Sequence, residues 1–230
     1  VSIEVQPHIF SRSINDFFSA IARRTVPGAY PKYFLGRQTY WTPVGTGEDV
    51  TQALCNEEGM VEVDQGTFSI EPFLFVDGRL VTWADVTLDQ DLQGGYLPIP
   101  SARWRGGDWV MTTTAFAERK RGKSVLYIRY RVESTAREPR SVTLYAAILP
   151  LQVTPTWQNW RSYGGVAPLK EISFREGVVW VNGNKALVPL TTPSGFGAAA
   201  FAQGWVAEHL AGAGLPPRTE VKDEFGHASG

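Results

Sequence analysis

The spacing of apolar residues changes from a helical to a strand period early in the chain. Residues 11–24 carry apolar side chains at i, i+3, i+4 and i+7, with a serine before them and arginines after them, which predicts one amphipathic helix. From Tyr40 onward the apolar period is two, the period of a β-strand. A short second helix is expected over 203–211. The apolar positions of the first helix are Ile14, Phe17, Phe18 and Ile21.

The clearest hairpin lies around Asp77-Gly78, whose residue types suit the two positive-φ positions of a type I′ turn. The arm before the turn, from Phe73, is apolar on both faces and is expected inside a sandwich. The arm after it is expected to run unbroken from Arg79 to Leu92. One face of that strand would be apolar, and the other would present an indole and three carboxylates: Trp83, Asp85, Asp89 and Asp91.

Further strands follow at intervals set by turn residues such as Arg121-Gly122 and Asn182-Gly183. Together they predict a mainly β fold, a large antiparallel two-sheet super-sandwich with an N-terminal helix and a short late helix. We assign 1–36 to the helix and its lead-in loop, and 37–230 to the sandwich as one domain. The expected later strands are 109–118, 123–134, 140–149, 170–175, 178–181, 186–191 and 197–202.

The composition of the chain argues against several classes of protein. The chain has 230 residues with 22 Lys+Arg against 23 Asp+Glu, so no basic surface for nucleic acid or anionic lipid is expected. No apolar run is long enough to span a membrane, and no signal peptide pattern is present. One cysteine and three histidines provide no disulfide framework and no metal-ligand spacing, so we expect neither a metal nor a cofactor. Compartment stays open. A start at Val1 and an end at Gly230 without a finishing element predict a segment of a longer protein.

Aromatic residues give the positive signal, because the chain holds 8 Trp, 8 Tyr and 12 Phe. Indole planes stack on the apolar faces of sugar rings, while carboxylates, amides and arginines bond the hydroxyls. Two clusters suit such a ligand: the Trp83 face described above, and an exposed loop after Pro155. The loop carries Trp157, Asn159, Trp160 and Arg161. Each cluster also has a structural interpretation, a solvated strand face for the first and gap-filling indoles for the second.

Catalysis by this segment alone has weaker support. No nucleophile elbow, phosphate loop or helix-borne metal motif is present. Carboxylates two apart on a strand lie about 6.5–7 Å apart, so Asp89, Asp91 or Glu118 could serve as acid and base on a sugar. His8, His209 and His227 do not fall in the middle of an expected strand, as an epimerase would require. Cys55, expected in a turn, has no neighbouring base and is interpreted as a structural thiol.

Two stretches resemble a known family. The run from Thr67 through the hairpin to Asp85, and the run Gly95-Tyr-Leu-Pro-Ile-Pro-Ser-Ala-Arg-Trp104, are similar to the galactose-mutarotase-like β super-sandwich domain of bacterial carbohydrate-active proteins. In that group the sandwich precedes an (α/α)6 barrel, as in glucoamylase-like hydrolases and disaccharide phosphorylases. Some of these multidomain proteins also carry a coagulation factor 5/8 type module. The resemblance covers most of 37–230.

The resemblance implies an accessory domain that packs on a C-terminal helical barrel, in which the catalytic carboxylates would lie. It assigns no catalytic residue to this chain and makes an oligosaccharide and the helical domain its partners. Trp104 joins the loop residues expected to reach a sugar or that domain. A sugar-modifying enzyme, mutarotase-like or hydrolytic, remains the alternative, and a purely structural spacer is a third possibility.

Overall fold

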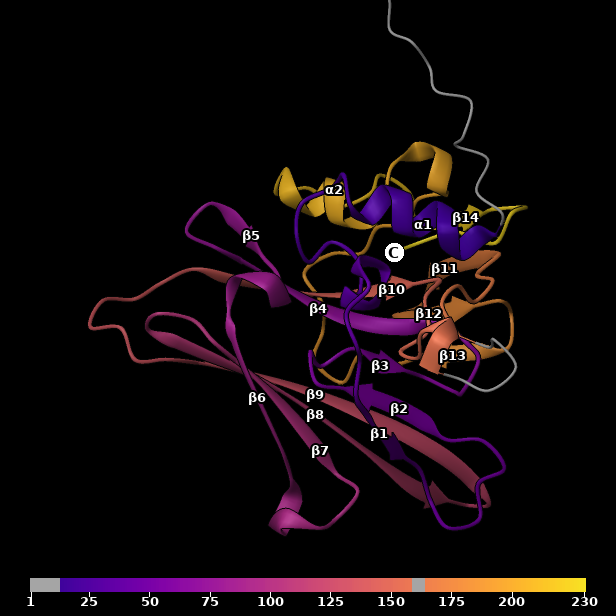
Figure 1. Ribbon diagram of the computed structural model, residues 1–230, viewed down its shortest axis with the longest axis horizontal. Helices are drawn as coiled ribbons and strands as arrows, with labels where there is room; N and C mark the ends of the chain where they lie inside the picture. Colours follow the sequence, from indigo (N-terminus) through magenta and orange to yellow (C-terminus); the bar gives the residue numbers. More distant parts are fainter. Residues whose placement is uncertain (1–12, 159–163) are drawn as a thin grey trace, which may run out of the picture.

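The computed structural model describes residues 13–158 and 164–230, and their fold is mainly β, as predicted (Figure 1). They form 14 strands in three antiparallel sheets, an N-terminal helix and a short late helix. The helices are α1 (Ile14–Ala22) and α2 (Val206–Ala211), with single 3-10 turns η1 (Lys32–Leu35), η2 (Trp83–Asp85), η3 (Gln93–Gly95), η4 (Thr156–Gln158) and η6 (Phe201–Gln203). Within the described ranges, no helix has the length and apolar character needed to cross a membrane.

The strands divide into three sheets instead of the two expected. The central sheet has the order β1-β2-β3-β4-β10, with β5 also paired to β4. Its strands are β1 (Trp41–Val44), β2 (Ala53–Asn56), β3 (Val61–Glu62), β4 (Ser69–Val76), β5 (Arg79–Val81) and β10 (Val142–Leu149). The long-strand sheet is β6 (Thr87–Leu92), β7 (Pro100–Arg105), β8 (Trp109–Lys120) and β9 (Lys123–Ser134). The small sheet has the order β13 (Lys185–Leu187), β12 (Val178–Val181), β11 (Glu171–Arg175) and β14 (Glu220–Lys222).

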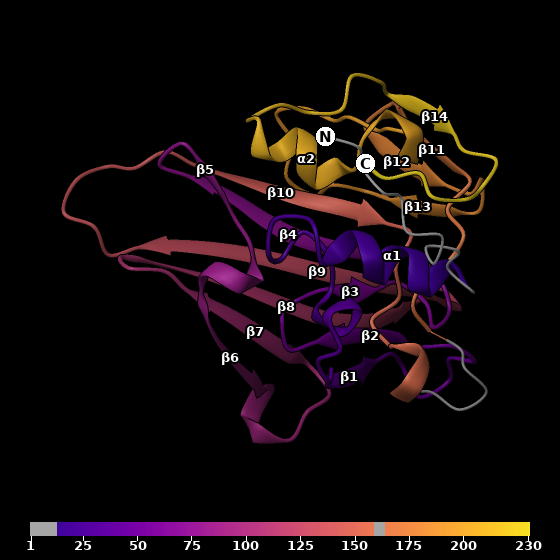
Figure 2. The ribbon, with the colours of Figure 1, turned by 45° about the horizontal axis from the view of Figure 1, so that its top comes forward.

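These elements stack in layers, with the central sheet in the middle. The helices α1 and α2 cover one of its faces and the long-strand sheet covers the other (Figure 2). The core under the helices joins Phe18 and Trp205 to Phe73 of β4, and the core on the opposite face joins Leu74 to Trp104 and Met111. Because β4 has an apolar layer on each side, nearly all of its residues are buried, as its two-faced apolar pattern predicts.

Local chemistry explains the elements that were predicted well. Ser13 begins α1 by accepting the backbone N–H of Asp16 on its side-chain oxygen. Asp77 and Gly78 adopt φ values of 52° and 81°, which confirms the tight turn between β4 and β5. β9 has the predicted bounds, and its inward residues Leu126 and Ile128 pack on the central sheet.

Three strand predictions are wrong in extent. The arm after Gly78 does not continue to Leu92, because η2 interrupts it and sends β6 into a different sheet. β13 ends at Leu187, two residues before Pro189, which has no N–H for a ladder. No strand forms over 197–202, because Ala198 and Ala199 each make a single bridge to a different segment.

Gly28, in the loop after α1, packs closely against Thr82. A Cβ added to Gly28, at φ +82°, would lie 2.0 Å from the Thr82 hydroxyl. That hydroxyl is fixed by its 3.0 Å hydrogen bond to the Pro27 carbonyl. Gly36→Ala is a matched control, because Gly36 has φ +77° but no atom within 4 Å of the added Cβ.

We expect Gly28→Ala to lower the free energy of unfolding by about 1–3 kcal/mol more than Gly36→Ala, the usual cost of overpacking. Both variants incur the same left-handed backbone strain, so their difference isolates the contact with Thr82. Urea titration of the two variants measures it. Equal losses would contradict the close packing of this loop on η2.

Candidate functional site

Trp83 and Asp85 do not lie on the face with Asp89 and Asp91, so this part of the site prediction is wrong. Thr82 and Asp85 form a capping box around η2: the Thr82 side chain accepts the Ala84 N–H, and the Asp85 carboxylate accepts the Thr82 N–H at 2.9 Å. This turn rotates Trp83 into the core, where the residue is 4% exposed. Its indole N–H donates to the Tyr30 carbonyl at 3.3 Å.

Trp104 is also a core residue rather than a loop residue. It lies in β7 on the face toward the central sheet and is 0% exposed. Its indole N–H donates to the Glu58 carbonyl at 2.8 Å. The fold therefore buries the ring and also provides a hydrogen-bond partner for its polar atom. The structure therefore places Trp104 in the core and not in a surface loop.

Asp89 and Asp91 share the solvent-exposed face of the long-strand sheet, as predicted, but arginines of β7 pair with them. Arg105 lies 2.9 Å from Asp89, and Arg103 lies 2.7 Å from Asp91. The hydrogen bond from Arg105 lowers the pKa of Asp89. A general acid requires a raised pKa, so this exposed, ion-paired strand face has the character of a solvated surface.

The loop after Pro155 is described only in part. Trp157 lies in η4 and is 55% exposed, with its ring edge-on to Tyr33 at 6.2 Å. Gln158 fixes this turn beside Thr39 through hydrogen bonds of 2.9 and 2.7 Å to the Thr39 N–H and carbonyl. The exposed Tyr40 follows directly. Asn159, Trp160 and Arg161 lie outside the described residues.

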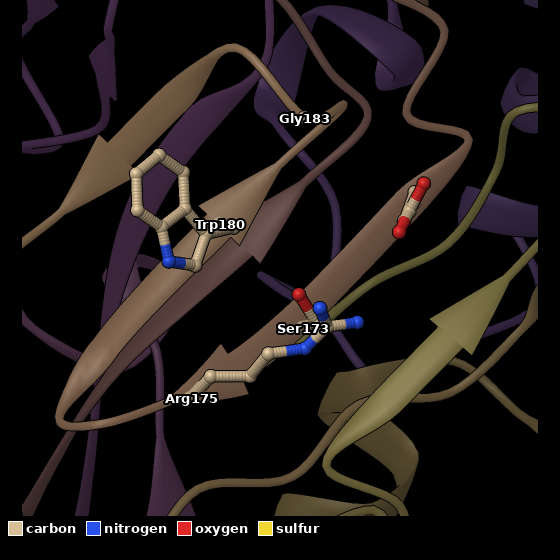
Figure 3. A pocket seen from close by; sticks show the side chains of 5 residues that line it. Ser173, Arg175, Trp180 and Gly183 are labelled. Carbon is tan, nitrogen blue, oxygen red and sulfur yellow. The ribbon is translucent and has the colours of Figure 1, made fainter.

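A group of side chains that sequence reasoning missed stands on the outer face of the small sheet. Val179 and Val181 of β12 face inward, which turns Trp180 outward with 42% of its surface exposed. Ser173 of β11 is its direct cross-strand partner, and Arg175 projects from the same strand (Figure 3). These residues border a hollow of about 230 Å³, the Trp180 hollow, lined by Glu171, Ser173, Arg175, Trp180 and Gly183.

The charges around this hollow are arranged by the neighbouring strand. Glu220 of β14 lies opposite Ser173 and holds Arg175 in an ion pair of 2.9 Å. The Glu171 carboxylate has no hydrogen-bond or ion-pair partner among the described residues, although Lys222 is its cross-strand neighbour. The hollow therefore offers an apolar indole face, a positioned guanidinium and a free carboxylate, which suits a ligand with an apolar face and hydroxyl groups.

The interior holds a second unexpected group, a set of buried carboxylates beneath η1. Lys32 forms ion pairs with Glu57 and, at 2.8 Å, with Glu58. Glu62 accepts the N–H of Val153 at 2.7 Å, and burial raises its pKa to about 7. Glu71 is 1% exposed, and its Oε2 has no partner within the described chain. Glu58, Glu62 and Glu71 are buried and none of them lines the Trp180 hollow, so we assign them to the interior.

The remaining reactive residue types carry no site. Cys55 lies in β2 rather than in a turn, and burial raises the pKa of its thiol to about 12, which makes it unreactive. His209 lies in α2, as expected, and His227 packs edge-on against Phe18. Within 13–158 and 164–230 no group of three or more His, Cys, Asp or Glu side chains could hold a metal ion.

Comparisons with known proteins identify no relative of this chain. No protein-family model, curated protein sequence or solved structure matches the chain. The resemblance to the mutarotase-like super-sandwich stays a prediction from the sequence.

Proposed function

We propose that this chain is an accessory carbohydrate-associated β-sandwich domain of a larger glycoside hydrolase or phosphorylase, and that it contacts sugar on the outer face of the small sheet. The observation that carries the proposal is the exposed indole of Trp180, which lines one hollow together with Arg175 and Glu171. This replaces the binding residues expected from the sequence, of which Trp83 and Trp104 are buried.

The chemistry of the Trp180 hollow fits a pyranose ring. The indole offers a flat apolar surface for the C–H face of the ring. The Glu171 carboxylate accepts hydrogen bonds from sugar hydroxyls, and the Arg175 guanidinium donates to them. Because Glu220 already holds Arg175, part of the entropy cost of fixing this long side chain is met before the ligand arrives.

The proposal also includes a second domain, the helical barrel that the resemblance implies. We assign the contact with that domain to the exposed side chains of Trp157 and Tyr40, whose sequence neighbours Gln158 and Thr39 are joined by two hydrogen bonds. Aromatic residues are enriched at protein interfaces. This contact is separate from the Trp180 hollow, so the two can be tested independently.

Replacing Trp180 with alanine tests the sugar contact. The purified chain is screened against arrays of α- and β-linked glucans, xylans, mannans and galactans. We expect binding of the best glycan to fall at least tenfold in Trp180→Ala, because the stacking surface is lost.

Trp157→Ala is the matched control, because it removes another exposed indole, one that lies in η4 and not in the small sheet. We expect that variant to bind like the wild type. Binding that survives Trp180→Ala, or is lost in Trp157→Ala, would overturn the assignment of the site. An absence of binding to every glycan would overturn the proposed sugar contact.

A further inference from the structure

The Trp180 hollow has a neighbour at the start of β11, where the segment entering this strand meets the β12–β13 turn. A second hollow of about 360 Å³, the Lys170 hollow, is lined by Pro168, Lys170, Glu171 and Asn182. Glu171 lines both hollows, and Asn182 and Gly183, one from each lining, are consecutive in the turn between β12 and β13. The two hollows therefore adjoin at Glu171.

From this juxtaposition we infer that the outer face of the small sheet is a groove for an uncharged oligosaccharide of at least two residues, with one sugar in each hollow. The inference rests on the proposed function and adds the class of ligand. Each hollow lies near or below the lower end of the range for small-molecule pockets, about 300–1,000 Å³. Each hollow can hold one sugar ring, and an oligosaccharide fills both hollows.

The hydrogen bonds of Asn182 keep the second hollow in place. The Asn182 side chain accepts the backbone N–H groups of Lys170 and Glu171 at 2.8 and 3.2 Å, and it donates to the Pro168 carbonyl at 3.0 Å. All three contacts tie the segment entering β11 to the β12–β13 turn. The amide is thus used by the fold, and the groups left for a ligand are the side chains of Lys170 and Glu171.

The Lys170 side chain is placed to bond the second sugar, and the Glu171 side chain lies at the junction between the two sugars. Neither has a hydrogen-bond or ion-pair partner of its side chain among the described residues, and Lys170 is exposed. Glu171 stands at the junction, because it lines both hollows. A carboxylate between two rings can accept hydroxyl hydrogen bonds from both.

Charge favours an uncharged chain over an acidic one. The cations of this face, Arg175 and Lys222, stand across the strands from the acids Glu220 and Glu171, so no cluster of unbalanced positive charge is present. Lys170 adds a single hydrogen-bond donor in the second hollow. A polyuronate or sulfated chain would place repeated negative charge beside both glutamates, which is unfavourable.

Calorimetry with sugars of increasing length tests the inference. The probes are glucose, xylose and mannose, and the di- to hexasaccharides of α-1,4-glucan, β-1,4-glucan, β-1,4-xylan and β-1,4-mannan. We expect an oligomer to bind at least about tenfold more tightly than its monosaccharide. Lys170→Ala should remove about three- to tenfold of the affinity for the oligomer and leave affinity for the monosaccharide unchanged, because Lys170 lines only the second hollow.

Lys222→Ala is the matched control, an exposed lysine on the same face that lines neither hollow. Equal affinity for monosaccharide and oligomer, or equal effects of Lys170→Ala and Lys222→Ala, would overturn the two-ring groove and leave the proposed function standing. Tighter binding of polygalacturonate oligomers than of all the neutral chains would overturn the uncharged class. No binding of any of these sugars would overturn the groove and the proposed sugar contact together.

Discussion

Replacing Trp104 with alanine is expected to lower the free energy of unfolding by about 3–5 kcal/mol, the usual cost of truncating a large buried aromatic ring. Trp104 is fully buried between the central and long-strand sheets. The change would empty space beside Leu74 and Met111 and leave the Glu58 carbonyl without its 2.8 Å indole donor. Urea unfolding followed by far-ultraviolet circular dichroism measures the loss.

Two other variants keep this prediction testable if Trp104→Ala does not fold. Trp104→Phe retains an aromatic ring but loses the hydrogen bond, so we expect a smaller loss than for alanine. Trp180→Ala removes an indole that is 42% exposed and is expected to cost much less than Trp104→Ala, as partly exposed surface positions generally do. A Trp104→Ala variant within about 1 kcal/mol of the wild type would mean that this ring is not part of the core.

Glu71→Gln is expected to reduce the dependence of stability on pH. Burial raises the pKa of Glu71 well above its usual range, and the charge of Glu58 raises it further. Above the ordinary glutamate pKa of about 4.3, the unfolded chain releases this proton while the folded protein retains it. The stability that Glu71 contributes is therefore complete below about pH 4.3 and is lost as pH rises through the pKa of the folded state.

The slope of the unfolding free energy against pH is the quantity to compare. One retained proton lowers stability by about 1.4 kcal/mol per pH unit within that window. Glu62, with a pKa of about 7, contributes in the same sense up to neutral pH in both proteins. The slope of Glu71→Gln should therefore be smaller but not zero. Slope is a better readout than absolute stability, because the new amide N–H groups are also buried.

Glu224→Gln provides the control, since it removes an exposed carboxylate. Denaturant midpoints from pH 4.5 to 8.5 for the three proteins supply the comparison. We expect the control to follow the wild type and Glu71→Gln to diverge from both as pH rises. If all three slopes agree, Glu71 does not hold its proton in the folded protein.

The features predicted well are those fixed by neighbouring residues. The Asp77-Gly78 turn and the alternation along 123–134 each depend on residues a few positions apart. The strand predicted through Trp83 is wrong although a local signal for the turn is present: Thr82 and Asp85 have the spacing of a capping box. That pattern, given its full weight, would have ended the strand at Val81.

The tryptophans illustrate which contacts cannot be predicted from the sequence alone. Trp104 is buried by packing between two sheets, and a carbonyl 46 residues earlier accepts its indole N–H; no local pattern contains these contacts. Trp180 could have been found, since Val179 and Val181 alternate with it and predict that it faces outward. Ser173 and Arg175 lie near Trp180 only because β11 pairs with β12. The hollow therefore forms when the sheet assembles and could not be predicted from one strand.

The most direct test of the sugar contact follows the tryptophan indole N–H signals by nuclear magnetic resonance. The chain is labelled with ¹⁵N, and the Trp180 signal is assigned as the one missing from Trp180→Ala. During titration with the best-binding oligosaccharide, we expect the Trp180 signal to shift in a saturable manner while those of the buried Trp83, Trp104 and Trp205 stay in place. A titration that shifts the Trp157 signal and leaves Trp180 unmoved would contradict a sugar site on the small sheet.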